Sequence, residues 1–162
     1  MEAKGSKKRI DRLIREKRKD FDMKTNTAKA AMVCSNCGAI FSNGKWTWKD
    51  QINNLRETTC PACKRINDNY PAGFVEIKGR FYSEHEKEIS NLIMNMEKTE
   101  KKERPLERIM MFKPEKSKAI LTTTGIHIAK RIGEALSKSY QGNFTFMYSD
   151  GEKSIRVLWE RQ

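Results

Sequence analysis

The chain of 162 residues contains no apolar run near the length of about 18 residues that a membrane-spanning helix needs. Residues 1–18 are polar and basic, so we expect no secretory signal sequence there. These two absences argue against membrane insertion and export. They predict a cytoplasmic protein in a reducing compartment, where disulfides are rare.

The sequence also lacks the usual parts of an enzyme. It has no Gly-x-Gly-x-x-Gly fingerprint and no P-loop, and its only two histidines are His85 and His127. Neither histidine has a Cys, Ser or carboxylate partner at a recognisable spacing, so we interpret both as surface residues. We predict a non-enzymatic protein without a small-molecule substrate.

Cysteine is scarce, and its placement is informative. The only four cysteines form two Cys-x-x-Cys pairs, Cys34/Cys37 and Cys60/Cys63, which 22 residues separate. Two such pairs at this separation match a tetrahedral zinc site in which each pair supplies two thiolates. We predict one structural Zn²⁺. Four thiolates leave no open coordination position, which argues against catalysis by the metal.

The cysteines have three alternative interpretations. Cys60-Pro-Ala-Cys63 also resembles a thioredoxin-like redox motif, but a second pair argues against that function. Two disulfides would need an oxidising compartment. Four unrelated buried cysteines would have no reason to fall into matched pairs.

Positive charge is in excess, with 33 Lys and Arg against 21 Asp and Glu and a net charge of +12. Residues 1–29 alone hold eleven basic and five acidic residues, which is half of that excess. A basic excess of this kind favours nucleic acid as the partner, ahead of an anionic membrane or an acidic protein. Ile10, Leu13 and Ile14 stand at helical spacing, so we expect a basic helical or flexible arm over residues 1–29. A solvated tail that only aids solubility is the alternative.

The remaining chain predicts an α+β protein of two domains. Residues 30–80 are expected to form a zinc ribbon, in which β-hairpin turns carry the cysteines and an Asn43-Gly44 turn joins two short strands. Residues 81–162 are expected to form an α-β-β-α-β-β domain, with one antiparallel sheet and both helices on one face. Ser83 with Glu86, and Thr124, are the predicted starts of its helices.

Basic and aromatic residues outside the arm add candidates for an RNA interface. Trp46 and Trp48 either stack on unpaired bases or, as we favour, fill the small core. Basic residues on the second helix of the α+β domain either bind phosphate or form an ordinary solvated surface. The predicted RNA-binding residues are Lys7, Lys8, Arg9, Arg12, Arg15, Lys17, Arg18, Lys19, Lys64, Arg65, Lys130 and Arg131.

Several motifs carry a resemblance to known families. They are Cys34-x-x-Cys37-Gly38, Cys60-Pro-Ala-Cys63-Lys64-Arg65-Ile66, and residues 68–73, 106–109 and 122–133. Over about residues 30–160 the chain resembles a little-characterised prokaryotic family that combines a four-cysteine zinc module with an α+β domain. More distantly it is similar to the zinc-bearing large-subunit export adaptor family of archaea and eukaryotes, whose longer zinc region holds more than one metal site. The resemblance implies a structural zinc and association with the ribosome or ribosomal RNA.

Together these observations predict a ribosome-associated, rRNA-binding protein that acts in assembly, subunit association or dormancy. The arm would supply sequence-independent affinity by releasing counterions, and Lys64, Arg65, Lys130 and Arg131 would fix orientation. A zinc-ribbon adaptor that docks a protein partner and a DNA-binding regulator are the alternatives.

Overall fold

A computed structural model describes residues 31–48, 54–149 and 153–162. The basic arm of residues 1–29, with its eight predicted RNA-binding residues, lies outside the described part. The chain divides into two compact units, of which the first ends at Thr58 and the second extends from Thr59 to Gln162. None of the described helices has the length and apolar character needed to cross a membrane.

The first unit contains a small four-stranded sheet with the strand order β3-β2-β1-β4. Its strands are β1 (Met32–Cys34), β2 (Ile40–Ser42), β3 (Lys45–Thr47) and β4 (Arg56–Thr58). Strands β2 and β3 form the hairpin predicted around Asn43-Gly44, and both turn residues have positive φ, 53° and 82°. This is the backbone that a type I′ turn requires. Strand β4 pairs with β1 in parallel.

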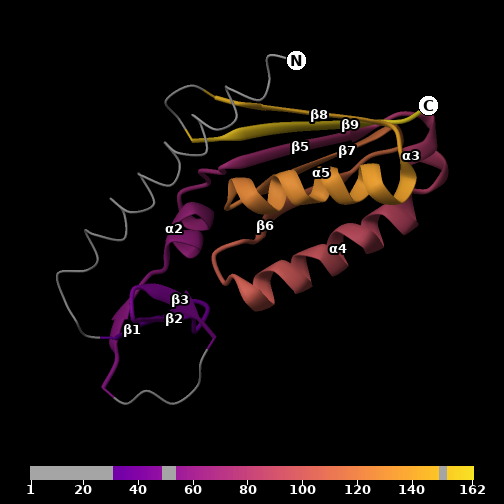
Figure 1. Cartoon of the computed structure of the whole chain (residues 1–162). Coiled ribbons are helices and arrows are strands. Elements are labelled where there is room, and N and C mark those ends of the chain that lie inside the picture. Colours follow the sequence, from indigo (N-terminus) through magenta and orange to yellow (C-terminus); the bar gives the residue numbers. More distant parts are fainter. Residues whose placement is uncertain (1–30, 49–53, 150–152) are drawn as a thin grey trace. The chain divides into compact units, whose positions relative to one another are not determined.

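The second unit packs helices against a five-stranded sheet with the order β6-β7-β5-β9-β8 (Figure 1). Its helices are α2 (Pro61–Asn67), α3 (Arg80–Glu84), α4 (Glu86–Glu103) and α5 (Ile126–Tyr140). Its strands are β5 (Gly73–Lys78), β6 (Ile109–Pro114), β7 (Lys118–Thr123), β8 (Asn143–Tyr148) and β9 (Ile155–Glu160).

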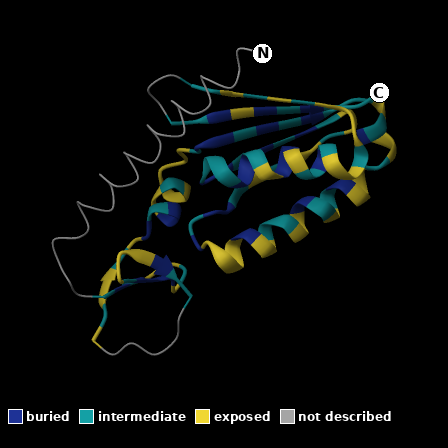
Figure 2. Ribbon diagram, viewed as in Figure 1, coloured by how far each residue is buried: buried dark blue, intermediate teal, exposed yellow. Residues whose placement is uncertain are grey.

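The core of this unit lies between one face of the sheet and the helices α4 and α5. Burial alternates along β5, β7 and β9, as Figure 2 shows, because successive side chains of a strand point to opposite faces. The buried side chains meet the apolar stripes of both helices, so both helices cover the same face. The largest fully buried ones are Trp159, Tyr82, Ile77, Ile89, Ile93, Leu121, Ile128, Ile132, Leu136, Ile155, Val75 and Thr123.

The predicted α-β-β-α-β-β order is present over residues 81–162, with α3 and α4 in place of one first helix, but the sheet differs from the prediction. Strand β5 joins it at the centre, where it pairs antiparallel with β7 and parallel with β9. The sheet is therefore mixed and not wholly antiparallel. Strand β9 pairs antiparallel with the preceding strand β8 and lies between β8 and β5, so β8 is at the edge of the sheet. The sequence predicts the residues of β5 within the zinc ribbon of residues 30–80, because alternation along a strand does not reveal which partners the strand takes.

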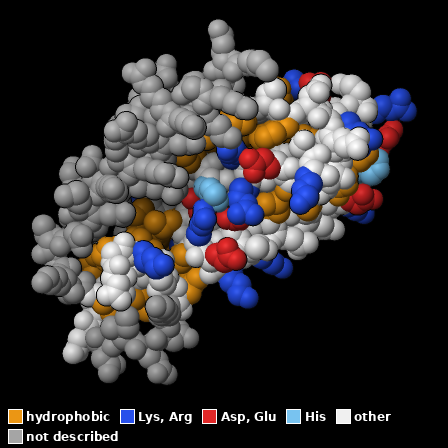
Figure 3. Space-filling model, in the orientation of Figure 1, with side chains coloured by type: hydrophobic (Ala, Val, Ile, Leu, Met, Phe, Trp, Pro, Cys, Tyr) orange, Lys and Arg blue, Asp and Glu red, His pale blue; other side chains and the backbone are white. Residues whose placement is uncertain are grey.

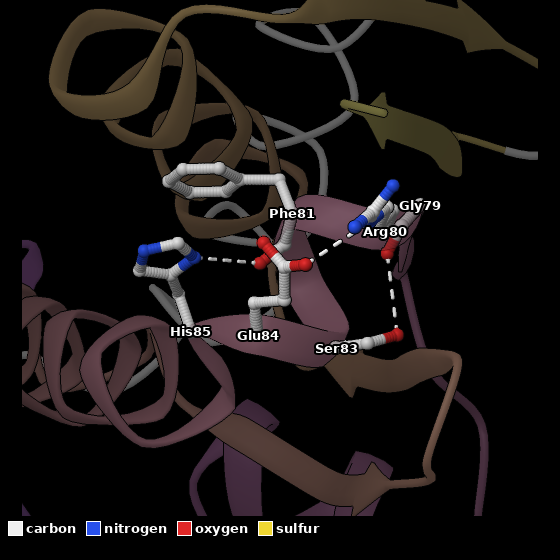
Figure 4. Close-up of polar contacts among 6 residues, drawn as sticks. All are labelled: Gly79, Arg80, Phe81, Ser83, Glu84 and His85. Carbon is white, nitrogen blue, oxygen red and sulfur yellow. Dashed lines mark hydrogen bonds and ion pairs between the residues drawn. The ribbon is translucent and has the colours of Figure 1, made fainter.

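The helix starts also differ from the prediction. Ser83 lies within α3, where its hydroxyl donates to the carbonyl oxygen of Gly79 over 3.5 Å, and Arg80 pairs with Glu84 over 3.0 Å (Figure 4). His85 precedes α4 and makes no side-chain cap; its Nδ1 lies 2.9 Å from the carbonyl oxygen of Phe81, and the two rings are stacked 4.0 Å apart. Local contacts between residues four apart thus replace the capping box expected from Ser83 and Glu86.

Candidate metal centre

The first cysteine pair lies where β1 ends and the chain turns back into β2. The N–H of Gly38 donates to the carbonyl oxygen of Cys34 over 2.9 Å, and the N–H of Cys34 donates to that of Ala39 over 2.8 Å. Gly38 has φ +81°, a conformation that a residue without a Cβ adopts at no steric cost. This tight turn keeps Cys34 and Cys37 close together.

The second pair lies at the start of α2 and not in a hairpin turn, which corrects the ribbon predicted there. Cys60 is the N-cap of the helix, and its sulfur accepts the N–H of Cys63 over 3.4 Å. Pro61 occupies the first helical position, where its missing N–H costs nothing. A Cys-x-x-Cys at a helix start therefore presents both sulfurs on the same side of one turn.

The four sulfur atoms all lie within 4.8 Å of one another. Cys34, Cys60 and Cys63 are buried, and none of the four cysteines forms a disulfide. With Zn–S bonds of about 2.3 Å, the sulfurs of a tetrahedral zinc site lie about 3.8 Å apart. The four cysteines can therefore hold a metal ion after a small contraction, and the donor set suits a thiophilic metal.

An arginine from elsewhere in the second unit contacts the second pair. Arg108 follows α4 and is only 6% exposed. Its Nη1 donates to the sulfur of Cys63 over 3.3 Å, its Nη2 to that of Cys60 over 3.7 Å, and its Nε to the carbonyl oxygen of Pro105 over 2.7 Å. A buried cation therefore faces the two thiol groups.

The segment around Arg108 is also anchored to the start of α5. The hydroxyl of Thr124 donates to the carbonyl oxygen of Leu106 over 2.6 Å and accepts the N–H of Arg108 over 2.9 Å. Thr124 is consequently not the predicted N-cap of α5; Gly125 is, and it makes no side-chain cap. The buried Glu107 supplies the missing acceptor, because its Oε2 lies 3.2 Å from the N–H of Ile128.

The predicted RNA-binding residues of the described part lie in two places. Lys64 and Arg65 directly follow Cys63 in α2, where Lys64 is exposed. The guanidinium of Arg65 lies 5.4 Å from the ring centre of Tyr70, which is 60% exposed. Together with Ile66, which is 42% exposed, these residues make up what we call the α2 surface.

Lys130 and Arg131 lie on α5, and both pair with carboxylates. The Nζ of Lys130 lies 3.7 Å from Glu134, and the Nε of Arg131 lies 2.9 Å from Glu100. The side chain of Arg131 is nevertheless 47% exposed. On the face drawn in Figure 3, Lys and Arg side chains of the described residues are interspersed with Asp and Glu. These charges are distributed as on an ordinary solvated surface.

The tryptophans differ in exposure. Trp46 is buried and packs against Phe41, with ring centres 5.4 Å apart, whereas Trp48 is half-buried. Trp46 is thus a core residue of the small sheet, as we favoured from the sequence.

Sequence reasoning missed three buried charged residues, Arg108, Glu107 and Glu100. Glu100 lies in α4 and pairs with Arg131, and its second oxygen lies 3.9 Å from Nε2 of His127. The only signal in the sequence was that Glu107 and Arg108 fall within a motif that carried the family resemblance.

Comparisons with protein-family models, with curated proteins and with solved structures returned no match to this chain.

Proposed function

We propose that this protein binds RNA without catalysing a reaction, that it associates with the ribosome, and that a single structural Zn²⁺ rigidifies its cysteine module. The observation that carries the proposal is the net charge of +12, half of which falls in residues 1–29 next to a four-cysteine site. Phosphate backbones attract such a charge, and a metal site without an open position fixes structure.

The α2 surface supports this function. A zinc ion bound to Cys60 and Cys63 would fix the first turn of α2, and with it the exposed cation of Lys64. Arg65 and Tyr70 present a guanidinium stacked on an aromatic ring, a pair suited to contacts with phosphates and unpaired bases. Because Lys130 and Arg131 already pair with carboxylates, they contribute less to the interface than Lys64 and Arg65.

The decisive experiment measures binding of the purified full chain to ribosomal RNA by fluorescence anisotropy at several salt concentrations. We expect affinity to fall steeply between low and physiological salt, because each neutralised phosphate contributes about one unit to the slope of log K against log salt. Binding that salt leaves unchanged would sink the counterion-release mechanism.

A charge-reversal pair tests the α2 surface directly. Lys64→Glu with Arg65→Glu is expected to weaken binding and to lower the salt slope by about two units, whereas Lys87→Glu with Lys98→Glu on exposed positions of α4 is the matched control. Equal losses in the two pairs would show that only total charge matters and that the α2 surface makes no specific contact.

The metal is tested separately by elemental analysis of protein purified without chelator. About one equivalent of zinc is expected, and less than about half an equivalent would contradict the tetrahedral site.

A protein-docking adaptor is the second candidate, because the exposed Ile66 and Tyr70 give the α2 surface an apolar component. In that case Ile66→Ser would abolish capture of a ribosomal protein while leaving RNA affinity unchanged. Competition between duplex DNA and structured RNA tests the remaining alternative, a DNA-binding regulator.

A further inference from the structure

We infer that Arg108 is a positioning residue of the metal centre, whose guanidinium binds the sulfurs of Cys60 and Cys63 and strengthens retention of the metal. This inference rests on the proposed zinc site but adds a residue that lies far from the cysteines in the sequence. Arg108 is 45 residues beyond Cys63 and 48 beyond Cys60.

The orientation of the guanidinium is fixed on both sides. Its Nε is held by the carbonyl oxygen of Pro105, and its two terminal nitrogens each face one sulfur, at 3.3 and 3.7 Å. The backbone of Arg108 is held in turn, because its N–H donates to the hydroxyl of Thr124 over 2.9 Å. The planar fork of an arginine thus bridges the sulfurs of one Cys-x-x-Cys pair.

Charge explains why a cation is suited to this position. Four thiolates carry twice the charge of one zinc ion, so the loaded centre is negative overall. Burial of a charged guanidinium is costly unless an opposite charge compensates it. A negative zinc–thiolate centre beside the buried Arg108 provides that compensation.

The hydrogen bonds also bear on the reactivity of the thiolates. A thiolate that accepts a charge-assisted N–H bond is harder to protonate and to oxidise, and such outer contacts orient metal ligands. Arg108 is therefore expected to slow loss of the metal as well as to raise affinity for it. A lysine at this position would keep the charge, but its single ammonium would not reproduce the paired geometry.

The test compares four zinc-loaded full-length proteins: wild type, Arg108→Met, Arg108→Lys and the control Arg104→Met. Arg104 is exposed, and it contacts Glu100 and Glu107 through its backbone N–H and carbonyl oxygen, which a methionine retains. Titration with a chromogenic chelator gives the zinc affinity. We expect Arg108→Met to bind zinc about 10- to 100-fold more weakly, Arg108→Lys to fall between it and wild type, and Arg104→Met to match wild type.

A spectroscopic arm covers the case in which Arg108→Met fails to fold. Both wild type and Arg108→Lys are loaded with Co²⁺. Loss of N–H···S bonds in Arg108→Lys is expected to shift its thiolate-to-metal charge-transfer bands from those of wild type. Identical bands together with identical zinc affinities would overturn the inference while leaving the metal site intact. A wild-type protein that binds neither Zn²⁺ nor Co²⁺ would refute the proposed site, and the role of Arg108 with it.

Discussion

Gly133 lies in the middle of α5, where glycine is normally unfavourable. Replacement of a mid-helix glycine by alanine ordinarily raises stability by about 1 kcal/mol. In this protein we expect the opposite, because α5 approaches the sheet closely at this position. A Cβ built on Gly133 would lie 2.3 Å from Cε2 of Phe144 and 2.7 Å from Cγ1 of Val157.

The size of the stability change depends on whether the neighbouring side chains can move away from the added methyl group. The ring of Phe144 is half-buried near the edge of the sheet and can yield, but Val157 is buried in β9 and cannot yield without displacing the strand. Overpacking of a well-packed core costs about 1–3 kcal/mol. After subtraction of the gain in helix propensity of about 1 kcal/mol, we expect Gly133→Ala to lower the free energy of unfolding by up to about 2 kcal/mol.

Urea unfolding followed by far-UV circular dichroism measures this change. The matched control is Ser139→Ala, at an exposed position of the same helix, which is expected to raise stability by a few tenths of a kcal/mol. Addition of Phe144→Leu to Gly133→Ala should recover part of the loss, because the two positions compete for the same space. If Gly133→Ala stabilised the protein as an ordinary glycine replacement does, the close approach of α5 to the sheet would be refuted.

Three further predictions concern buried polar groups and the metal. The hydroxyl of Tyr82 is buried without a hydrogen-bond partner in the described part of the chain, and burial raises the pKa of Tyr82 above its ordinary value of 10.0. The free energy of unfolding is therefore expected to be unaffected below about pH 10 and to fall above it, since the Tyr82 hydroxyl ionises first in the unfolded chain. Urea unfolding at alkaline pH should show a smaller fall for Tyr82→Phe. Glu107→Gln is expected to lower stability by about 1 kcal/mol, because a neutral amide replaces the carboxylate at the start of α5; an unchanged melting temperature would contradict that role. Removal of zinc by a chelator should lower the melting temperature of the second unit, since Cys60, Cys63 and Arg108 belong to it. With Trp46 and Trp48 replaced by Phe, the fluorescence of Trp159 reports on this unit alone. A melting temperature that the chelator leaves unchanged would refute the expectation.

The features that the sequence predicted correctly depend on short-range chemistry. The Cys-x-x-Cys spacing brings each sulfur pair together through one local turn, and Asn43-Gly44 adopts the hairpin conformation that it favours in any context. The order of helices and strands over residues 81–162 was also predicted, and α4 and α5 are present in that order, because each helix must bury one apolar stripe.

The features that it missed depend on partners far along the chain. Thr124 is followed by a helix and looks like a cap, but its hydroxyl contacts Leu106 and Arg108 instead. Buried and less buried side chains alternate along β5, as they would in the small sheet of the first unit or in the five-stranded sheet, so the central position of β5 could not be foreseen. Arg108 and Glu107 resemble ordinary charged loop residues in the sequence, because their partners Cys60, Cys63, Thr124 and Ile128 lie 16 or more residues away along the chain.

The position of β9 has a consequence for the order in which the protein is made. Strand β9 lies between β5 and β8, although it follows every other described element in the chain. Until β9 has been synthesised, one edge of β5 stays unpaired and β8 has no strand to join, so the five-stranded sheet cannot close. The nascent chain therefore exposes an apolar strand edge until residues 155–160 have been made, which is the state that chaperones bind and from which aggregation begins.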